Sequence, residues 1–181
     1  MRAMKRVPPA EFEPALKKRL EELWGTPPNL YRCLANHPKL VAAWTEFART
    51  LRHESNTPRA LRELLILRGA QLMGSEYEWA QHLRMARNSG VREEQIAALA
   101  AWRTSMEFDA REKAALALAE AVTQGRVGDD VYQEARRHFD EQDYVELSLT
   151  AAFYAMVGRM LDAMGVQLEP EFRGYTPKLP R

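Results

Sequence analysis

The twenty residues from Glu63 to His82 constrain the fold of this chain more than any other stretch. They read ELLILRGAQLMGSEYEWAQH. A helix over the first part carries apolar side chains on both of its sides: Leu61, Leu64, Leu65 and Leu72 on one, and Ile66, Leu67, Ala70 and Met73 on the other. A helix that is apolar all round is buried by its neighbours. Gly74 and Ser75 then interrupt the pattern, so the sequence predicts a buried helical hairpin.

The same hairpin holds an unusual set of polar side chains. Glu63 lies among the apolar residues of the first helix. Glu78 and His82 are four residues apart in the second helix, a spacing that places them on one face. Two carboxylates and an imidazole in one buried hairpin are the strongest concentration of reactive chemistry in the chain.

The remaining sequence also predicts helices. Thr57 is suited to cap a helix whose first position is Pro58, and Asp109 with Glu112 has the spacing of a capping box. Long helices are expected over residues 11–24 and 142–164. The chain has no extended period-2 alternation of the kind that predicts a strand. The predicted fold class is therefore all-α.

Length and composition limit the possible functions. The chain has 181 residues, which favours a single domain over 1–181. Its 26 basic and 25 acidic residues give a net charge of +1, so nucleic acid and acidic membrane surfaces are not the expected partners. Nothing in the sequence resembles a secretory signal or a bilayer-spanning run. The single cysteine, Cys33, excludes an intrachain disulfide and favours a cytoplasmic location.

The hairpin and its flanks resemble the carboxymuconolactone decarboxylase family, which includes the alkylhydroperoxidase D branch. The resemblance rests on LRELLILRGA, GSEYEWAQH and GVREEQIAAL within residues 58–100. It extends more loosely to NLYRCLANHP upstream and to VELSLTAAFY and MLDAMGV downstream. It implies an alkylhydroperoxidase D-like helical bundle that needs no metal or cofactor. Residues 1–8 and 167–181 are expected to be extended arms.

Within the resembled family, this chain can be compared with the peroxidase branch. That branch carries Glu, then Cys-x-x-Cys beginning twelve residues later, then His four residues after the second Cys. The corresponding residues here are Glu63, Ser75, Glu78 and His82. Glu and His match, but both thiols are absent. A hydroxyl cannot replace a thiolate as the peroxide nucleophile, so we do not expect thiol peroxidase activity.

The resemblance therefore favours cofactor-free lyase chemistry on a small carboxylated lactone or a related intermediate of aromatic degradation. Such a decarboxylation needs an acid–base residue and a group that binds the substrate carboxylate. We expect His82 to carry the proton, Glu78 to orient the imidazole, and Glu63 to act as a second acid–base or positioning group. Arg68 is the candidate carboxylate binder, because guanidinium groups bind carboxylates in a bidentate manner.

Structural roles compete with several of these assignments. Ser75, a candidate for substrate binding, also has the position of a helix cap, and Trp79 either lines a pocket or packs in the core. Arg68 is also the natural partner of Glu63. A metal site formed by Glu63, Glu78 and His82 is a further alternative.

Two other functions remain open at this point. One is a non-catalytic accessory protein of the same fold, and the other is residual peroxidase activity through Cys33. The family usually forms oligomers, so we expect a dimer, trimer or hexamer. The broad apolar bands over Leu40–Leu51 and Ala114–Val122 are the expected contact surfaces.

Overall fold

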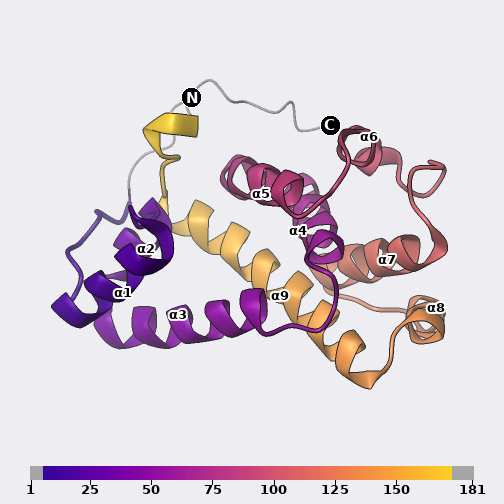
Figure 1. Cartoon of the computed structure of the whole chain (residues 1–181), viewed down its shortest axis with the longest axis horizontal. Coiled ribbons are helices and arrows are strands. Elements are labelled where there is room, and N and C mark those ends of the chain that lie inside the picture. The colour runs from indigo at the N-terminus through magenta and orange to yellow at the C-terminus, as the bar shows by residue number, and fades with distance from the viewer. Residues whose placement is uncertain (1–5, 173–181) are drawn as a thin grey trace. The chain divides into compact units, whose positions relative to one another are not determined.

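A computed structural model describes residues 6–172, and these residues confirm the all-α prediction (Figure 1). No strand occurs within this range. The elements in chain order are α1 (Pro14–Trp24), α2 (Asn29–Leu34), α3 (Pro38–His53), α4 (Arg59–Met73), α5 (Glu76–Asn88), α6 (Glu93–Ala98), the 3-10 turn η1 (Leu99–Ala101), α7 (Ala110–Gln124), α8 (Asp129–His138), α9 (Glu141–Met164) and the 3-10 turn η2 (Pro170–Phe172).

The chain forms two compact units. Of the described residues, 6–54 and 160–172 belong to the first unit and 55–159 to the second. The single domain expected over 1–181 remains a prediction. In the part of the chain that the structure describes, no helix is long and apolar enough to cross a membrane.

The first unit has a small core between α1, α2 and α3. Leu20, Tyr31 and Val41 are its buried centre. The predicted arms are partly wrong and partly outside the described residues. Residues 170–172 form the η2 turn, and the backbone amide of Val7 donates to the Met164 carbonyl at 3.0 Å. Residues 1–5 and 173–181 lie outside the described range.

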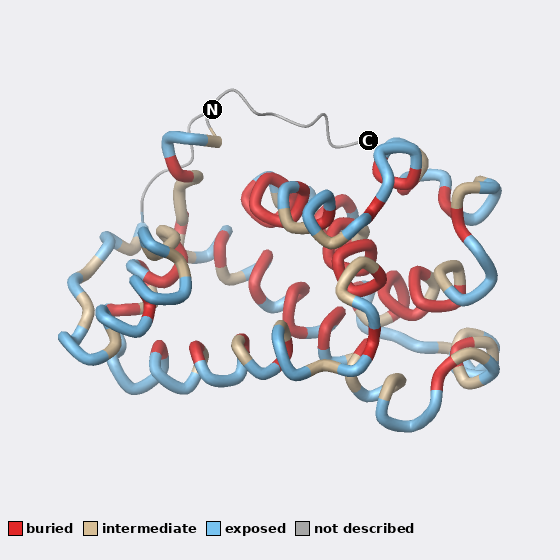
Figure 2. The backbone as a smooth tube through the Cα atoms, viewed as in Figure 1, coloured by how far each residue is buried: buried red, intermediate tan, exposed pale blue. Residues whose placement is uncertain are grey.

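The second unit is built around α4, as the sequence predicts. Every residue of α4 from Leu61 to Gln71 except Arg68 is buried, and Figure 2 shows this helix as an almost continuous buried segment. The neighbouring helices α5 and α7 both pack against it. This arrangement explains the absence of a polar stripe, because α4 is covered on more than one side.

The turn between α4 and α5 follows the predicted break at Gly74 and Ser75. Gly74 ends α4 in the left-handed conformation with φ 64°, which glycine adopts without a side-chain clash. Ser75 caps α5, and its Oγ accepts a hydrogen bond from the Glu78 amide at 3.4 Å. A side chain at Gly158 of α9 would meet Met73 Cε at 2.8 Å, so glycine there allows α9 to pass close to this turn.

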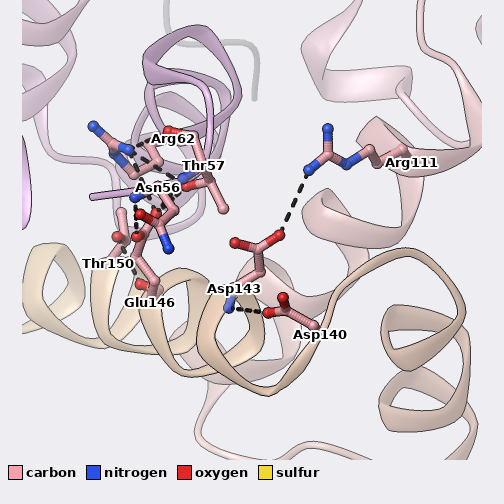
Figure 3. Close-up of polar contacts among 8 residues, drawn as sticks. All are labelled: Asn56, Thr57, Arg62, Arg111, Asp140, Asp143, Glu146 and Thr150. Carbon is pink, nitrogen blue, oxygen red and sulfur yellow. Dashed lines mark hydrogen bonds and ion pairs between the residues drawn. The ribbon is translucent and has the colours of Figure 1, made fainter.

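The start of α4 differs from the prediction. Thr57 is not the cap of α4, which begins at Arg59. Instead, Glu146 of α9 accepts hydrogen bonds from the Asn56 amide at 2.6 Å and the Thr57 amide at 3.0 Å, and also from the Thr57 hydroxyl (Figure 3). Arg62 Nη1 lies 3.4 Å from the same carboxylate. One half-buried carboxylate from a distant part of the sequence therefore holds the two residues that lie just before Pro58 and the start of α4.

Candidate functional site

The centre of the site is a hydrogen bond between α4 and α5. His82 Nδ1 of α5 lies 2.8 Å from Glu63 Oε2 of α4. His82 is 3% exposed and Glu63 is 0% exposed. The packing of α5 against α4 brings the two residues together across the hairpin. A carboxylate and an imidazole that are this close and this deeply buried interact strongly, because little solvent screens them.

Glu78 lies on the other side of the imidazole. Its Oε2 is 3.6 Å from His82 Nε2, which is ion-pair distance but too long for a hydrogen bond. From the sequence, Glu78 was expected to orient the imidazole ring. In the structure, the ring forms its hydrogen bond with Glu63 instead. Glu78 lies one turn before His82 in the same helix, and its carboxylate therefore lies beside Nε2 and not beside Nδ1. Glu78 is thus placed beside the nitrogen that Glu63 leaves available.

Arg59 of α4 binds the second oxygen of the Glu63 carboxylate. Its Nη2 donates to Glu63 Oε1 and also lies 3.8 Å from Met85 Sδ. The predicted pair between Glu63 and Arg68 is therefore wrong. The correct partner lies one turn before Glu63 on the same helix, and this four-residue spacing is a signal that the sequence contains.

The charge state of Glu63 follows from its neighbours. Burial raises the pKa of Glu63, but the charges and hydrogen bonds of His82 and Arg59 lower it further, so the net shift is downward. Glu63 is therefore a carboxylate that accepts hydrogen bonds. Because an ionised carboxylate can only accept, His82 Nδ1 donates in this hydrogen bond, and Nε2 is the ring nitrogen that lies toward Glu78.

An aromatic side chain from α9 packs on the imidazole. The rings of Tyr154 and His82 are edge to face, with centroids 4.7 Å apart and an interplanar angle of 83°. The sequence did not predict this contact, because 72 residues separate the two and no local pattern marks the tyrosine. Tyr154 fixes the ring from a third direction, in addition to Glu63 and Glu78.

Arg68 belongs to a different cluster. Its Nε donates to Glu120 Oε1 at 2.6 Å and its Nη1 to Gln71 Oε1 at 2.9 Å. Trp102 Nε1 donates to Glu120 at 2.8 Å, and Arg103 Nη2 donates to its other oxygen. Burial raises the pKa of Glu120, but these hydrogen bonds lower it to below its ordinary value. Arg68 thus holds α4 to α7, and we do not place it among the substrate-binding residues.

Ser75 and Trp79 have structural contacts. The Ser75 hydroxyl caps α5, which is the structural alternative that the sequence offered. Trp79 is 3% exposed and packs in a core cluster with Leu64, Leu67 and Leu83. Its indole lies in this core.

Two further alternatives from the sequence can be examined. Among the described residues, no group of three His, Cys, Asp or Glu side chains is arranged to hold a metal ion. Cys33 is buried in the first unit, and its Sγ donates to the Val7 carbonyl at 3.5 Å. It packs as the small core residue that its sequence position indicated.

Comparison with known proteins identifies the family of this chain. The model of the carboxymuconolactone decarboxylase family matches residues 38–121. The uncharacterized protein YdfG of Bacillus subtilis is 36% identical over 115 residues, which are 62% of this chain and 78% of that protein. The chain therefore belongs to the carboxymuconolactone decarboxylase family.

Solved structures show the same alkylhydroperoxidase D-like fold. A variant of the debrominase Bmp8 in complex with 2,3,4-tribromopyrrole has a TM-score of 0.83 at 21% identity, over 96% of this chain and 97% of that one. A peroxidase-related protein from Silicibacter sp. TM1040 has a TM-score of 0.81 at 19% identity, over 95% and 94% of the two chains. An alkylhydroperoxidase D core protein from Ralstonia eutropha JMP134 has a TM-score of 0.79 at 20% identity, over 92% and 93%.

Proposed function

We propose that this protein is a thiol-independent acid–base enzyme of the carboxymuconolactone decarboxylase family. Its substrate is a small carboxylated lactone or a related intermediate of aromatic degradation, and it uses no cofactor. The observation that carries this proposal is the buried Glu63–His82 hydrogen bond, which leaves His82 Nε2 directed toward Glu78. The neighbour that holds 2,3,4-tribromopyrrole supports the size class, because it is a small ring bound on the same fold.

The chemistry assigned to His82 is proton transfer at Nε2. In the decarboxylation, the bond between the ring carbon and the carboxylate breaks, and carbon dioxide leaves. The electron pair moves into the conjugated lactone carbonyl, and a proton must then be added to carbon. An imidazole side chain is the usual carrier of such a proton at neutral pH.

The two carboxylates have separate roles in this scheme. Glu63 holds the proton on Nδ1 and stabilises the imidazolium that forms when Nε2 takes up a proton. Glu78 faces Nε2 at ion-pair distance, so its charge favours a proton on that nitrogen. Arg59, which is 28% exposed, keeps Glu63 ionised.

The site is closed in this structure. Since His82 is 3% exposed, a substrate reaches Nε2 only when surrounding side chains move. A closed site favours decarboxylation, because exclusion of water strengthens the electrostatic interactions and leaves the leaving carboxylate poorly solvated. Entry of the substrate and release of carbon dioxide are then tied to this opening.

The test is decarboxylation of carboxymuconolactone, followed as carbon dioxide release and as loss of the conjugated lactone absorbance. His82→Gln should lower kcat by a factor of about 10² to 10⁴, the usual contribution of a general acid–base group. His138→Gln is the matched control, because His138 of α8 pairs with Glu134 away from this site. No turnover by the wild type, or a His82→Gln variant within about threefold of it, would overturn the proposal.

A further inference from the structure

The first unit contains a cavity of about 290 Å³. It lies between the residues that precede α1, the helix α2 and the segment that follows α9, and we call it the α2 cavity. This volume is close to the lower end of the range for small-molecule sites in proteins, so the cavity can hold a single small ring. Its apolar side chains are those of Val7, Pro9, Val166, Leu168 and Pro170.

Hydrogen bonds between distant parts of the chain hold the walls of the α2 cavity in place. The Val7 amide donates to the Met164 carbonyl at 3.0 Å. On the other wall, Asn29 Nδ2 of α2 donates to the Gln167 carbonyl at 2.9 Å, which fixes the segment after α9 (Figure 1). The walls are thus formed before a ligand binds, and a preformed site loses less entropy on binding.

Arg32 gives the α2 cavity a positive charge. Among the described residues it is the only charged residue of the lining, and its guanidinium has no ion pair or hydrogen bond within this part of the chain. Residues 1–5 and 173–181 contain no Asp or Glu. Glu169 is buried and outside the lining, and its Oε1 accepts a hydrogen bond from the Asn29 amide at 2.6 Å. The charge of Arg32 is therefore available to an anion.

We propose that the α2 cavity binds a small ring that carries one carboxylate. The ring lies between the apolar walls, and the carboxylate accepts hydrogen bonds from the Arg32 guanidinium in a bidentate manner. All residues of this site belong to the first unit, whereas Glu63 and His82 belong to the second. The site does not depend on the decarboxylation proposed above.

Other candidate surfaces are already engaged by residues of the chain itself. A second cavity of the first unit has only about 120 Å³. Both of its arginines have partners, because Arg49 pairs with Glu54 at 2.5 Å and Arg52 Nη1 donates to the Tyr31 hydroxyl at 3.2 Å. The apolar band over Ala114–Val122 packs in a core cluster of the second unit, so the prediction of a contact surface there is wrong.

The first test uses Cys33, which lines the α2 cavity and is the only cysteine in the sequence. Labelling by iodoacetamide, followed as the mass of the intact protein, therefore reports on this cavity. Benzoate at about ten times its dissociation constant should slow the labelling roughly tenfold, since only the free cavity reacts. Benzamide has the same ring without the charge and should leave the rate nearly unchanged. Both are titrated to about 50 mM at constant ionic strength, a range that includes millimolar affinities.

Variants of two arginines test the role of the charge. Arg32→Gln should abolish the protection by benzoate and should leave the labelling rate without benzoate unchanged, because the substitution removes only the guanidinium from an exposed position. Arg126→Gln is the matched control, because Arg126 is an exposed arginine of the second unit. Benzoate should protect this variant as fully as the wild type. Far-ultraviolet circular dichroism confirms that both variants are folded.

The second test is two-dimensional NMR, which decides the question even if Cys33, at 4% exposed, does not react. The amide signals of Val7, Val166 and Leu168 should shift with benzoate in the wild type and in His82→Gln, and should not shift in Arg32→Gln. Unshifted signals in the wild type, a Cys33 that reacts equally fast with and without benzoate, or full protection in Arg32→Gln would each overturn the proposal. Equal protection by benzamide, or a loss of binding in His82→Gln, would also overturn it.

Discussion

Replacing Glu63 tests the energetics of the site most directly. The carboxylate is fully buried, and its two oxygens accept hydrogen bonds from Arg59 and from His82 Nδ1. Glu63→Ala removes both interactions and leaves a buried imidazole without its partner. Glu63→Gln keeps an acceptor of similar size but removes the charge. The two variants therefore separate the hydrogen bond from the ion pair.

The magnitudes follow from the burial of each partner. A hydrogen bond to a charged group contributes about 1.5–3 kcal/mol, and the bond to Arg59 belongs near the lower end because that side chain is 28% exposed. We expect Glu63→Ala to lower the free energy of unfolding by about 3–5 kcal/mol, the range seen when a buried pair loses one member. Glu63→Gln should cost about 1–3 kcal/mol, because a neutral acceptor remains.

The effect should depend on pH in a definite direction. The pKa of Glu63 is lowered from 4.5 in the folded protein, so the carboxylate binds protons less readily there than in the unfolded chain. Its stabilisation is therefore fully present above the unfolded value and is lost as the pH falls through the lower folded value. The difference between wild type and Glu63→Gln should shrink on acidification below 4.5.

Urea unfolding followed by far-ultraviolet circular dichroism measures these differences. Glu76→Gln is the matched control, because Glu76 is an exposed acid in the first turn of α5 and should change stability by less than about 0.5 kcal/mol. If Glu63→Gln is as stable as this control at neutral pH, or if the difference between them does not change with acidification, the reasoning about the buried pair is refuted.

Two further predictions concern other residues. Glu120→Gln should lower the free energy of unfolding by about 2–3 kcal/mol at neutral pH, because a buried carboxylate that accepts from Trp102 and Arg68 loses its charge; the loss should diminish on acidification, since the pKa of Glu120 is also lowered. Urea unfolding again measures it, and a loss below about 0.5 kcal/mol contradicts it. Cys33→Ser should leave peroxide consumption with a dithiol reductant at background, as in the wild type; thiol-dependent turnover that vanishes in the variant contradicts the assignment of Cys33 as a core residue.

Local sequence signals predicted much of the fold. The break at Gly74 and Ser75, the capping box of Asp109 and Glu112, and the burial of α4 are all found in the structure. These features depend on residues within one or two helical turns of each other. The start of α4 was misplaced because the Thr57 hydroxyl, which was expected to cap the helix, donates instead to Glu146, which lies far away in the sequence.

The prediction of the site was also limited to features that are local in the sequence. The sequence brought Glu63, Glu78 and His82 together as candidates, because the hairpin and its spacing are local. It could not show which carboxylate reaches Nδ1, since that depends on how α5 rotates against α4. Arg68 was misassigned for a related reason. Its partner Glu120 lies on α7, and the other donors to that carboxylate come from residues that are far from Arg68 in the sequence.

Two faces of α9 have different surroundings. Tyr154 packs against His82, while Leu149, Ala152 and Met156 lie on the exposed face of the same helix. A shift of α9 that adjusts Tyr154 against the imidazole also moves the exposed face of that helix. Any molecule that holds this face in place therefore resists a displacement of Tyr154, because coupling between two binding events is reciprocal.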